Sequence, residues 1–272
     1  MTDLIRTIRV NHINVVLEDY DEMVDHYERH FDGANVLDLP QTTWHACLMD
    51  VGRVIFELFA PSEFFLHTRY GPHYIGIEYQ VEDLDAAREV LAARGIRVAR
   101  ELGVALHSHP ADCHGVSLEL FGGYFHDNDD ILTAPMRSAE YWRDEHPLGL
   151  TGLQGVTVAV TDLSQAVEDF RAVFEGEIVF EGARPAVAGS AVGVRFADTV
   201  LELVAPDGDG PLQQHLLRHG EGIRSTVFGV RDLEQARGCL RDRAFELVPG
   251  TAPGSLAIPA EQNLGVIFEF AE

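Results

Sequence analysis

INVVLEDYDEM, at residues 13–23, decides the fold, because a short apolar strand pattern ends there and a helical pattern begins. Apolar side chains alternate along the strand, and Asp19 then stands where a helix N-cap is expected. Three later stretches repeat this change from strand to helix: IEYQVEDLDAA at 77–87, VTVAVTDLSQA at 156–166 and VFGVRDLEQA at 227–236. The chain therefore contains the same module four times.

Each copy also ends on an apolar strand that carries a glutamate. The four stretches are VIFELF with Glu57, VSLELF with Glu119, VLELVAP with Glu202 and VIFEF with Glu269. These glutamates follow the four capping aspartates by 38, 36, 40 and 37 residues. The interval has room for one helix and two further strands. Each copy is therefore predicted to run strand, helix, strand, strand, strand (βαβββ), an α+β arrangement in which one helix packs against a small sheet.

The longest segment without a repeat lies between the second and third copies. It covers 123–150 and separates the first two modules from the last two. We therefore expect an N-terminal domain over 1–122, a connector over 123–150 and a C-terminal domain over 151–272.

The composition excludes several classes of partner and cofactor chemistry. There are 44 acidic and 20 basic residues, for a net charge of -24, and every basic residue is an arginine. Such a surface repels phosphate backbones and anionic lipids, so we expect no nucleic acid and no membrane as partner. The absence of lysine excludes a Schiff base and a Walker lysine. Three cysteines without a Cys-x-x-Cys pair, and an N-terminus without an apolar segment, predict a cytoplasmic protein with reduced thiols.

The strand–helix–three-strand module, occurring in pairs, resembles the vicinal-oxygen-chelate superfamily of glyoxalases, bleomycin-resistance proteins and extradiol dioxygenases. The resemblance covers nearly the whole chain, and HPADCHGVSLELF at 109–121 is similar to the end of a methylmalonyl-CoA epimerase-type module. It implies that two modules form one cupped sheet, so that four modules make two glyoxalase-like domains. The reaction stays open, because the superfamily contains isomerases, lyases, dioxygenases, thiol transferases and drug-binding proteins.

The resemblance also implies where a metal would be held. The family's ligands are a histidine or glutamine on the first strand, seven residues before the capping aspartate, and the glutamate of the last strand. His12 occupies the first-strand position in copy one, and Asn14 shares its face because strand side chains alternate. The corresponding positions of the other copies hold Gly76, Gly155 and Ser225. Ten of the thirteen histidines precede residue 127, so we expect the metal centre in the N-terminal half.

We expect His12, His73 and Glu119 to bind the metal and Glu57 to act as the catalytic base. His73 has the wrong parity for a regular strand, so it would reach the site across a bulge or from the preceding loop. One of the pair His107 and His109 is the alternative source of a second imidazole. Imidazole and carboxylate ligands suit a divalent ion, and Zn, Fe, Mn, Ni and Co are not distinguished by the sequence.

Three functions fit these features. The first is a metal-dependent isomerase or lyase that polarises a carbonyl or vicinal oxygens of a small oxygenated metabolite for proton transfer. The alternative is a metal-free ligand-binding or resistance protein of the same fold. A second alternative is an extradiol-type dioxygenase, although those enzymes carry their two histidines and glutamate in the second half. A small molecule is the expected partner, a homodimer is left open, and the second half is expected to be scaffold or lid.

Overall fold

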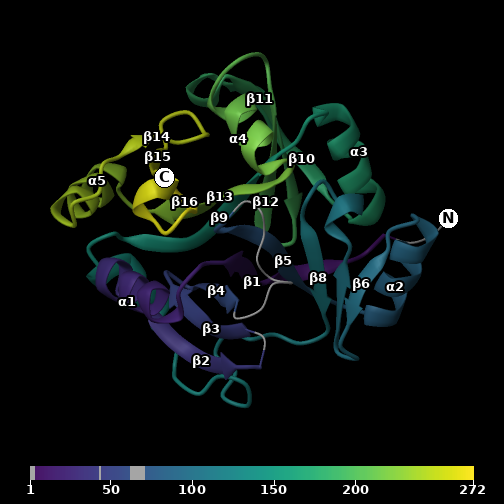
Figure 1. Ribbon diagram of the computed structural model, residues 1–272, viewed down its shortest axis with the longest axis horizontal. Coiled ribbons are helices and arrows are strands. Elements are labelled where there is room, and N and C mark those ends of the chain that lie inside the picture. Colours follow the sequence, from purple (N-terminus) through teal and green to yellow (C-terminus); the bar gives the residue numbers. More distant parts are fainter. Residues whose placement is uncertain (1–3, 43, 62–70) are drawn as a thin grey trace. The chain divides into compact units, whose positions relative to one another are not determined.

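The computed structural model describes residues 4–42, 44–61 and 71–272 (Figure 1). The chain divides into two compact units, each assembled from separate stretches of sequence. Unit 1 holds the residues up to Asn11, 75–124 and 155–224. Unit 2 holds 12–74, 125–154 and 225–272. The domain boundaries expected at 122 and 151 stay a prediction.

The element order is the predicted one, repeated four times. The first module is β1 (Thr7–Val16), α1 (Tyr20–Phe31), β2 (Ala34–Pro40), β3 (Trp44–Val51) and β4 (Val54–Pro61). The second is β5 (His73–Val81), α2 (Leu84–Ala93), β6 (Val98–Glu101), β7 (Ala105–Ser108) and β8 (Ser117–Phe121). The third is β9 (Leu150–Ala159), α3 (Leu163–Val173), β10 (Glu177–Arg184), β11 (Gly189–Phe196) and β12 (Thr199–Pro206). The fourth is β13 (Gly222–Val230), α5 (Leu233–Asp242), β14 (Val248–Pro249), β15 (Leu256–Ile258) and β16 (Ile267–Ala271).

The four repeated aspartates cap these helices as predicted. Asp19, Asp83, Asp162 and Asp232 each have extended backbone and accept a hydrogen bond from a backbone N–H two or three residues later. The five hydrogen bonds, two of them to Asp83, measure 2.9–3.0 Å. Each bond satisfies one of the N–H groups that a helix start leaves without an intrahelical partner. The caps thus fix the point at which each module turns from strand to helix.

The strands form two eight-stranded sheets, in the orders β2-β3-β4-β1-β5-β8-β7-β6 and β10-β11-β12-β9-β13-β16-β15-β14. The first and last strands of every module pair in parallel, and the other pairs within a module are antiparallel. The α+β class with paired modules is therefore confirmed. The parallel pairing also brings each first strand, where the family's histidine is expected, beside the strand that carries the glutamate.

In unit 2, α1 contacts β2, β3 and β4, while α5 contacts β16 (Figure 1). Aromatic side chains fill the space between these elements. The ring centroids of Tyr27 and Phe31 on α1 lie 5.7 and 5.5 Å from that of Phe268. The ring of Phe56 on β4 stacks on Phe268 with a centroid separation of 5.1 Å. The apolar face of the first module is thus buried by the fourth module within this unit.

From Phe125 onward the connector belongs to unit 2 and packs on its first module. Leu132 and Met136 join Val36, Leu48 and Ile55 in a buried cluster. The backbone N–H of Thr133 and that of the next residue both donate to the carbonyl of Val36. A five-residue π-helix, η2 (Tyr141–Glu145), follows. Ile55 lies one residue before Phe56 on β4, so the connector covers the sheet face opposite α1.

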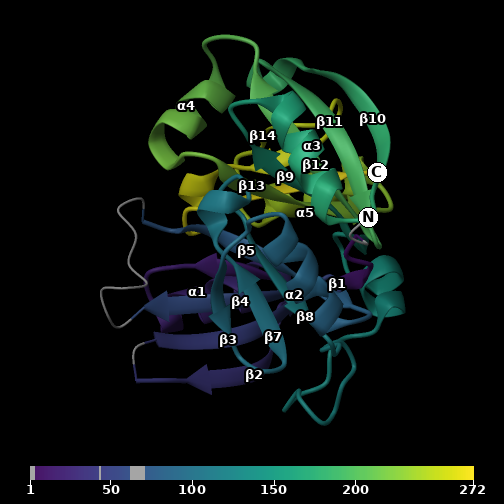
Figure 2. The same cartoon turned by 90° about the vertical axis from the view of Figure 1, so that its right-hand side faces the viewer.

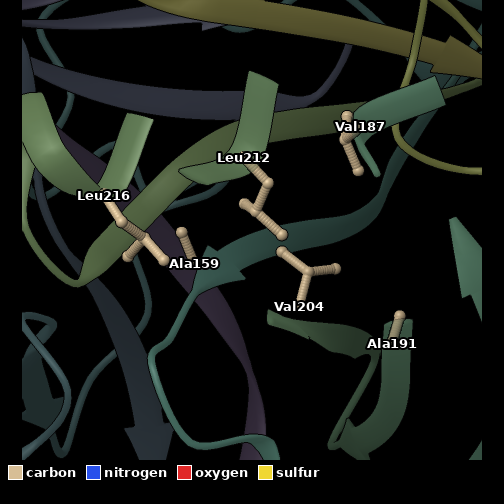
Figure 3. Close-up of a cluster of buried hydrophobic side chains, with 6 residues drawn as sticks. All are labelled: Ala159, Val187, Ala191, Val204, Leu212 and Leu216. Atoms are coloured by element: carbon tan, nitrogen blue, oxygen red, sulfur yellow. The ribbon is translucent and has the colours of Figure 1, made fainter. Parts of the chain in front are cut away.

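In unit 1, α2 contacts β7 and β8, and α3 contacts β11 and β12 (Figures 1 and 2). An additional helix, α4 (Pro211–His219), was not among the expected elements. Its Leu212 and Leu216, one helical turn apart, project onto Ala159, Ala191 and Val204 (Figure 3). No helix in the described part of the chain is long and apolar enough to cross a membrane.

Candidate metal centre

The first part of the site lies on β1 and β4. His12 and Asn14 share one face of β1, as parity predicted, and Glu57 joins them because it is the register partner of Asn14 in this parallel pair. His12 Nε2 lies 3.3 Å from Glu57 Oε2, with side-chain exposures of 3% and 16%. The alternate residues Ile13 and Val15 are fully buried. Strand alternation therefore places the polar groups on one face and the core on the other.

The connector adds an aromatic wall beside His12. The ring of Phe125 meets the imidazole edge-on, with centroids 5.4 Å apart. Phe125 also packs against the cluster formed by Val36, Leu48 and Ile55. Its place follows from connector packing, which the sequence did not reveal.

The second part of the site lies on β5, β7 and β8. Glu78 and Glu119 are register partners in the parallel pair β5/β8, so their carboxylates stand side by side. His107 on β7 is the register partner of Glu119 from the other side, and its Nε2 lies 3.1 Å from Glu119 Oε1. The glutamates are 2% and 5% exposed. Two carboxylates and one imidazole therefore share one face of the sheet within unit 1.

His12, Glu78 and Glu119 form a group in which one ligand atom from each residue lies within 4.8 Å of the others. His12 belongs to β1, the strand that both units share, because their boundary falls between Asn11 and His12. Among the described residues, no other set of three or more His, Cys, Asp or Glu side chains meets this criterion. Isolated buried carboxylates are costly unless a cation or hydrogen bonds offset their charge. One imidazole and two carboxylates are suitable ligands for a divalent first-row ion.

The residues expected from the sequence fall in different places. His12 and Glu119 belong to the group, and Glu57 adjoins His12. His73 is not in the group; its Nδ1 lies 2.9 Å from the carbonyl oxygen of Gly71, and burial lowers the pKa of its imidazole. Its role as a ligand, like that of Glu57 as the base, stays a prediction. Glu78 was missed.

The corresponding glutamates of the second half are neutralised by protein groups. Arg184 Nε donates to Glu202 in a buried ion pair, and Thr157 donates to the other oxygen at 3.4 Å. Glu269 accepts from Ser225 Oγ at 2.7 Å and from the N–H and Oγ1 of Thr251 at 2.6 and 2.7 Å. An arginine and a hydroxyl donor at Glu202, and three donors at Glu269, thus take the place that a cation would fill.

Residues 9–132 match the sequence model of the Glyoxalase/Bleomycin resistance protein/Dioxygenase superfamily. This part of the chain belongs to that superfamily. The match contains all the residues of the candidate centre. The match ends inside the connector, so the second half is assigned to the same fold by its strand order and not by the sequence match. No protein of curated function matches the chain in sequence.

Solved structures share the glyoxalase-like architecture over the full length. A triple mutant of 4-hydroxymandelate synthase from Streptomyces coelicolor is 13% identical, with a TM-score of 0.75, and the alignment covers 97% of this chain and 92% of that one. An Mn(II)-bound glyoxalase from Novosphingobium aromaticivorans is 12% identical, with a TM-score of 0.63 and coverages of 98% and 82%. At these identities the likeness establishes the fold.

Proposed function

We propose that this protein is a metal-dependent enzyme of the glyoxalase superfamily that catalyses proton transfer, as an isomerase or lyase, on a small oxygenated metabolite. The observation that carries the proposal is the buried group of His12, Glu78 and Glu119. These three residues would hold one divalent ion. When bound, such an ion polarises a carbonyl or a pair of vicinal oxygens and stabilises the charge that develops on oxygen.

Glu57 is the proposed general base. It is the most exposed of the three glutamates at this site, and its Oε2 lies beside His12 Nε2. A substrate held at the centre would therefore place an acidic C–H within reach of a carboxylate, which takes the proton on Oε2 and returns it to carbon. Phe125 walls the site next to His12 and excludes water from that side.

Metal content tests the first part of this proposal. The protein would be purified without added metal and without a histidine tag, and assayed by inductively coupled plasma mass spectrometry. We expect about one divalent ion per chain, lost in His12→Ala and retained in the control His45→Ala, whose imidazole pairs with Asp38 on the surface. Metal-free wild-type protein that also fails to take up Mn²⁺, Fe²⁺, Co²⁺, Ni²⁺ or Zn²⁺ would refute the metalloenzyme and favour the ligand-binding alternative.

Hydrogen–deuterium exchange at carbon tests the second part. Enolisable carbonyl compounds would be incubated in D₂O with the metal-loaded protein, and loss of the α-proton followed by NMR. Glu57→Gln should lower the exchange rate at least about 100-fold, the usual contribution of a general base, and keep its metal. An exchange rate in Glu57→Gln equal to that of the wild type would show that Glu57 is not the base.

A further inference from the structure

We propose that His107 on β7 supplies the second imidazole of this metal centre. The inference rests on the proposed metal function and adds a ligand to it. The second histidine would then lie on β7, next to the strand of Glu119, and not on β5, where the family places one.

The backbone at Gly76 leaves no space for a side chain. A Cβ built on Gly76 would lie 1.9 Å from the carbonyl oxygen of Ser117 and 2.8 Å from its carbonyl carbon. Real Cβ atoms do not approach backbone atoms this closely, so β5 and β8 are too near each other for a histidine here. The family's position on the second module is therefore closed in this chain.

His107 and Glu78 flank Glu119 from the two neighbouring strands. His107 lies opposite Glu119 in the antiparallel pair β7/β8, and Glu78 lies opposite it in the parallel pair β5/β8. Directly paired residues point to the same face. Three adjacent strands thus present an imidazole and two carboxylates on one face of the sheet.

Ser108 fixes the position of β7 against β8. Its hydroxyl accepts from the N–H of Leu118 at 2.9 Å, and its carbonyl accepts from Ser117 Oγ at 3.3 Å. Ser108 is fully buried. The strand that carries His107 is therefore anchored at the next residue, which limits the freedom of the imidazole.

The spacing of donor atoms agrees with shared coordination. Two atoms bound to one ion at about 2.1 Å lie about 3 Å apart when their bonds are at right angles. His107 Nε2 and Glu119 Oε1 are 3.1 Å apart, and the His107 side chain is 17% exposed. The two atoms can therefore bind the same ion once the imidazole turns toward it, since His107 lies outside the group of ligand atoms that are within 4.8 Å of one another.

Charge balance favours the same set. Two carboxylates, from Glu78 and Glu119, neutralise a divalent ion, and two neutral imidazoles, from His12 and His107, complete the ligands without further charge. A neutral assembly is the least costly to bury. Glu57 is then left outside the ligand set and is available as the base.

The experiment uses Mn²⁺ as the probe. Electron paramagnetic resonance of free Mn²⁺ gives stoichiometry and Kd, and pulsed electron paramagnetic resonance of bound Mn²⁺ counts directly coordinated imidazole nitrogens. We expect two imidazoles in the wild type and one in either His107→Ala or His107→Gln, with Kd raised at least tenfold. His12→Ala should lose the other imidazole. The control His45→Ala, whose imidazole pairs with Asp38 on the surface, should keep both nitrogens and the wild-type Kd.

Two outcomes would overturn the inference, and they are distinguishable. Wild-type protein that binds Mn²⁺ through one imidazole, with unchanged binding in both His107 variants, removes His107 from the ligand set and leaves the proposed function standing. Wild-type protein that binds no Mn²⁺, nor the other divalent ions, removes the metal centre itself and the inference with it. His107→Gln keeps a polar side chain at the position, so a folded variant is available if His107→Ala unfolds.

Discussion

Replacing Glu78 with glutamine should stabilise the metal-free protein and lower the stability that the protein gains from metal. The carboxylates of Glu78 and Glu119 are both buried and their ligand atoms lie within 4.8 Å of each other. At an effective dielectric constant of about 20, two unit negative charges at that distance repel by about 3.5 kcal/mol. Structural relaxation reduces this, so Glu78→Gln should stabilise the metal-free protein by about 1–3 kcal/mol.

Addition of Mn²⁺ should diminish this advantage. Binding to the folded state adds RT ln(1 + [Mn²⁺]/Kd) to the free energy of unfolding, and a tenfold loss of affinity lowers that gain by about 1.4 kcal/mol. Urea unfolding at pH 8 would be followed by circular dichroism, once with a chelator and once with excess Mn²⁺. The matched control is Glu202→Gln, which leaves Arg184 buried without its carboxylate. That variant should lose about 3 kcal/mol with or without Mn²⁺.

A single result would refute this reasoning. If Glu78→Gln destabilises the chelated protein by more than about 1 kcal/mol, as Glu202→Gln should, repulsion between the two carboxylates does not govern the stability of the metal-free site.

Three further predictions address the fold around the site. Gly76→Ala should destabilise the protein by about 3 kcal/mol in urea unfolding, because its Cβ would strike the Ser117 carbonyl. The control Gly122→Ala, with nothing within 4 Å of its Cβ, should stay within about 0.5 kcal/mol of wild type. Burial raises the pKa of the Asp50 carboxyl to about 6. The folded protein therefore holds the Asp50 proton more tightly than the unfolded chain, whose pKa is near 3.8, and this contribution to stability is lost as the pH rises toward 6. Measured relative to Asp50→Asn, the free energy of unfolding should fall by up to about 3 kcal/mol from pH 4 to 6. A flat difference would contradict it. Leu212→Ala should cost about 2–4 kcal/mol by emptying the α4 cluster, and an unchanged urea midpoint would show that α4 is not docked.

The sequence was sufficient for the order of the elements. The capping aspartates and the terminal glutamates are local signals, repeated four times, and the helices and strands follow from them. The alternation of side chains along a strand also assigned His12 and Asn14 to one face before any pairing was known, and the structure adds Glu57 to that face.

Glu78 could have been found by the same rule. It stands two residues after Gly76, on the same face, and its distance from Asp83 matches that of Asn14 from Asp19. The family's ligand position in this module is that of Gly76, and it does not point to Glu78. α4 also had a signal, since Leu212 and Leu216 are spaced by one helical turn behind a proline at the first turn.

Other features depend on tertiary packing and carry no local signal. Phe125 reaches His12 because the connector fills the face of β2–β4 that α1 does not cover. The contact between Gly76 and Ser117 depends on how closely β5 and β8 approach. His107 could be placed on a strand from the sequence, but its register with Glu119 follows from a hairpin whose length the sequence does not specify.

The most direct test of the central claim is a crystal structure of the protein grown with Mn²⁺ and measured at the manganese absorption edge. The account predicts one strong anomalous peak per chain, bounded by His12, Glu78 and Glu119. A peak beside Glu202 or Glu269 in the second half, or no peak in crystals that contain Mn²⁺ in the solvent, would contradict it.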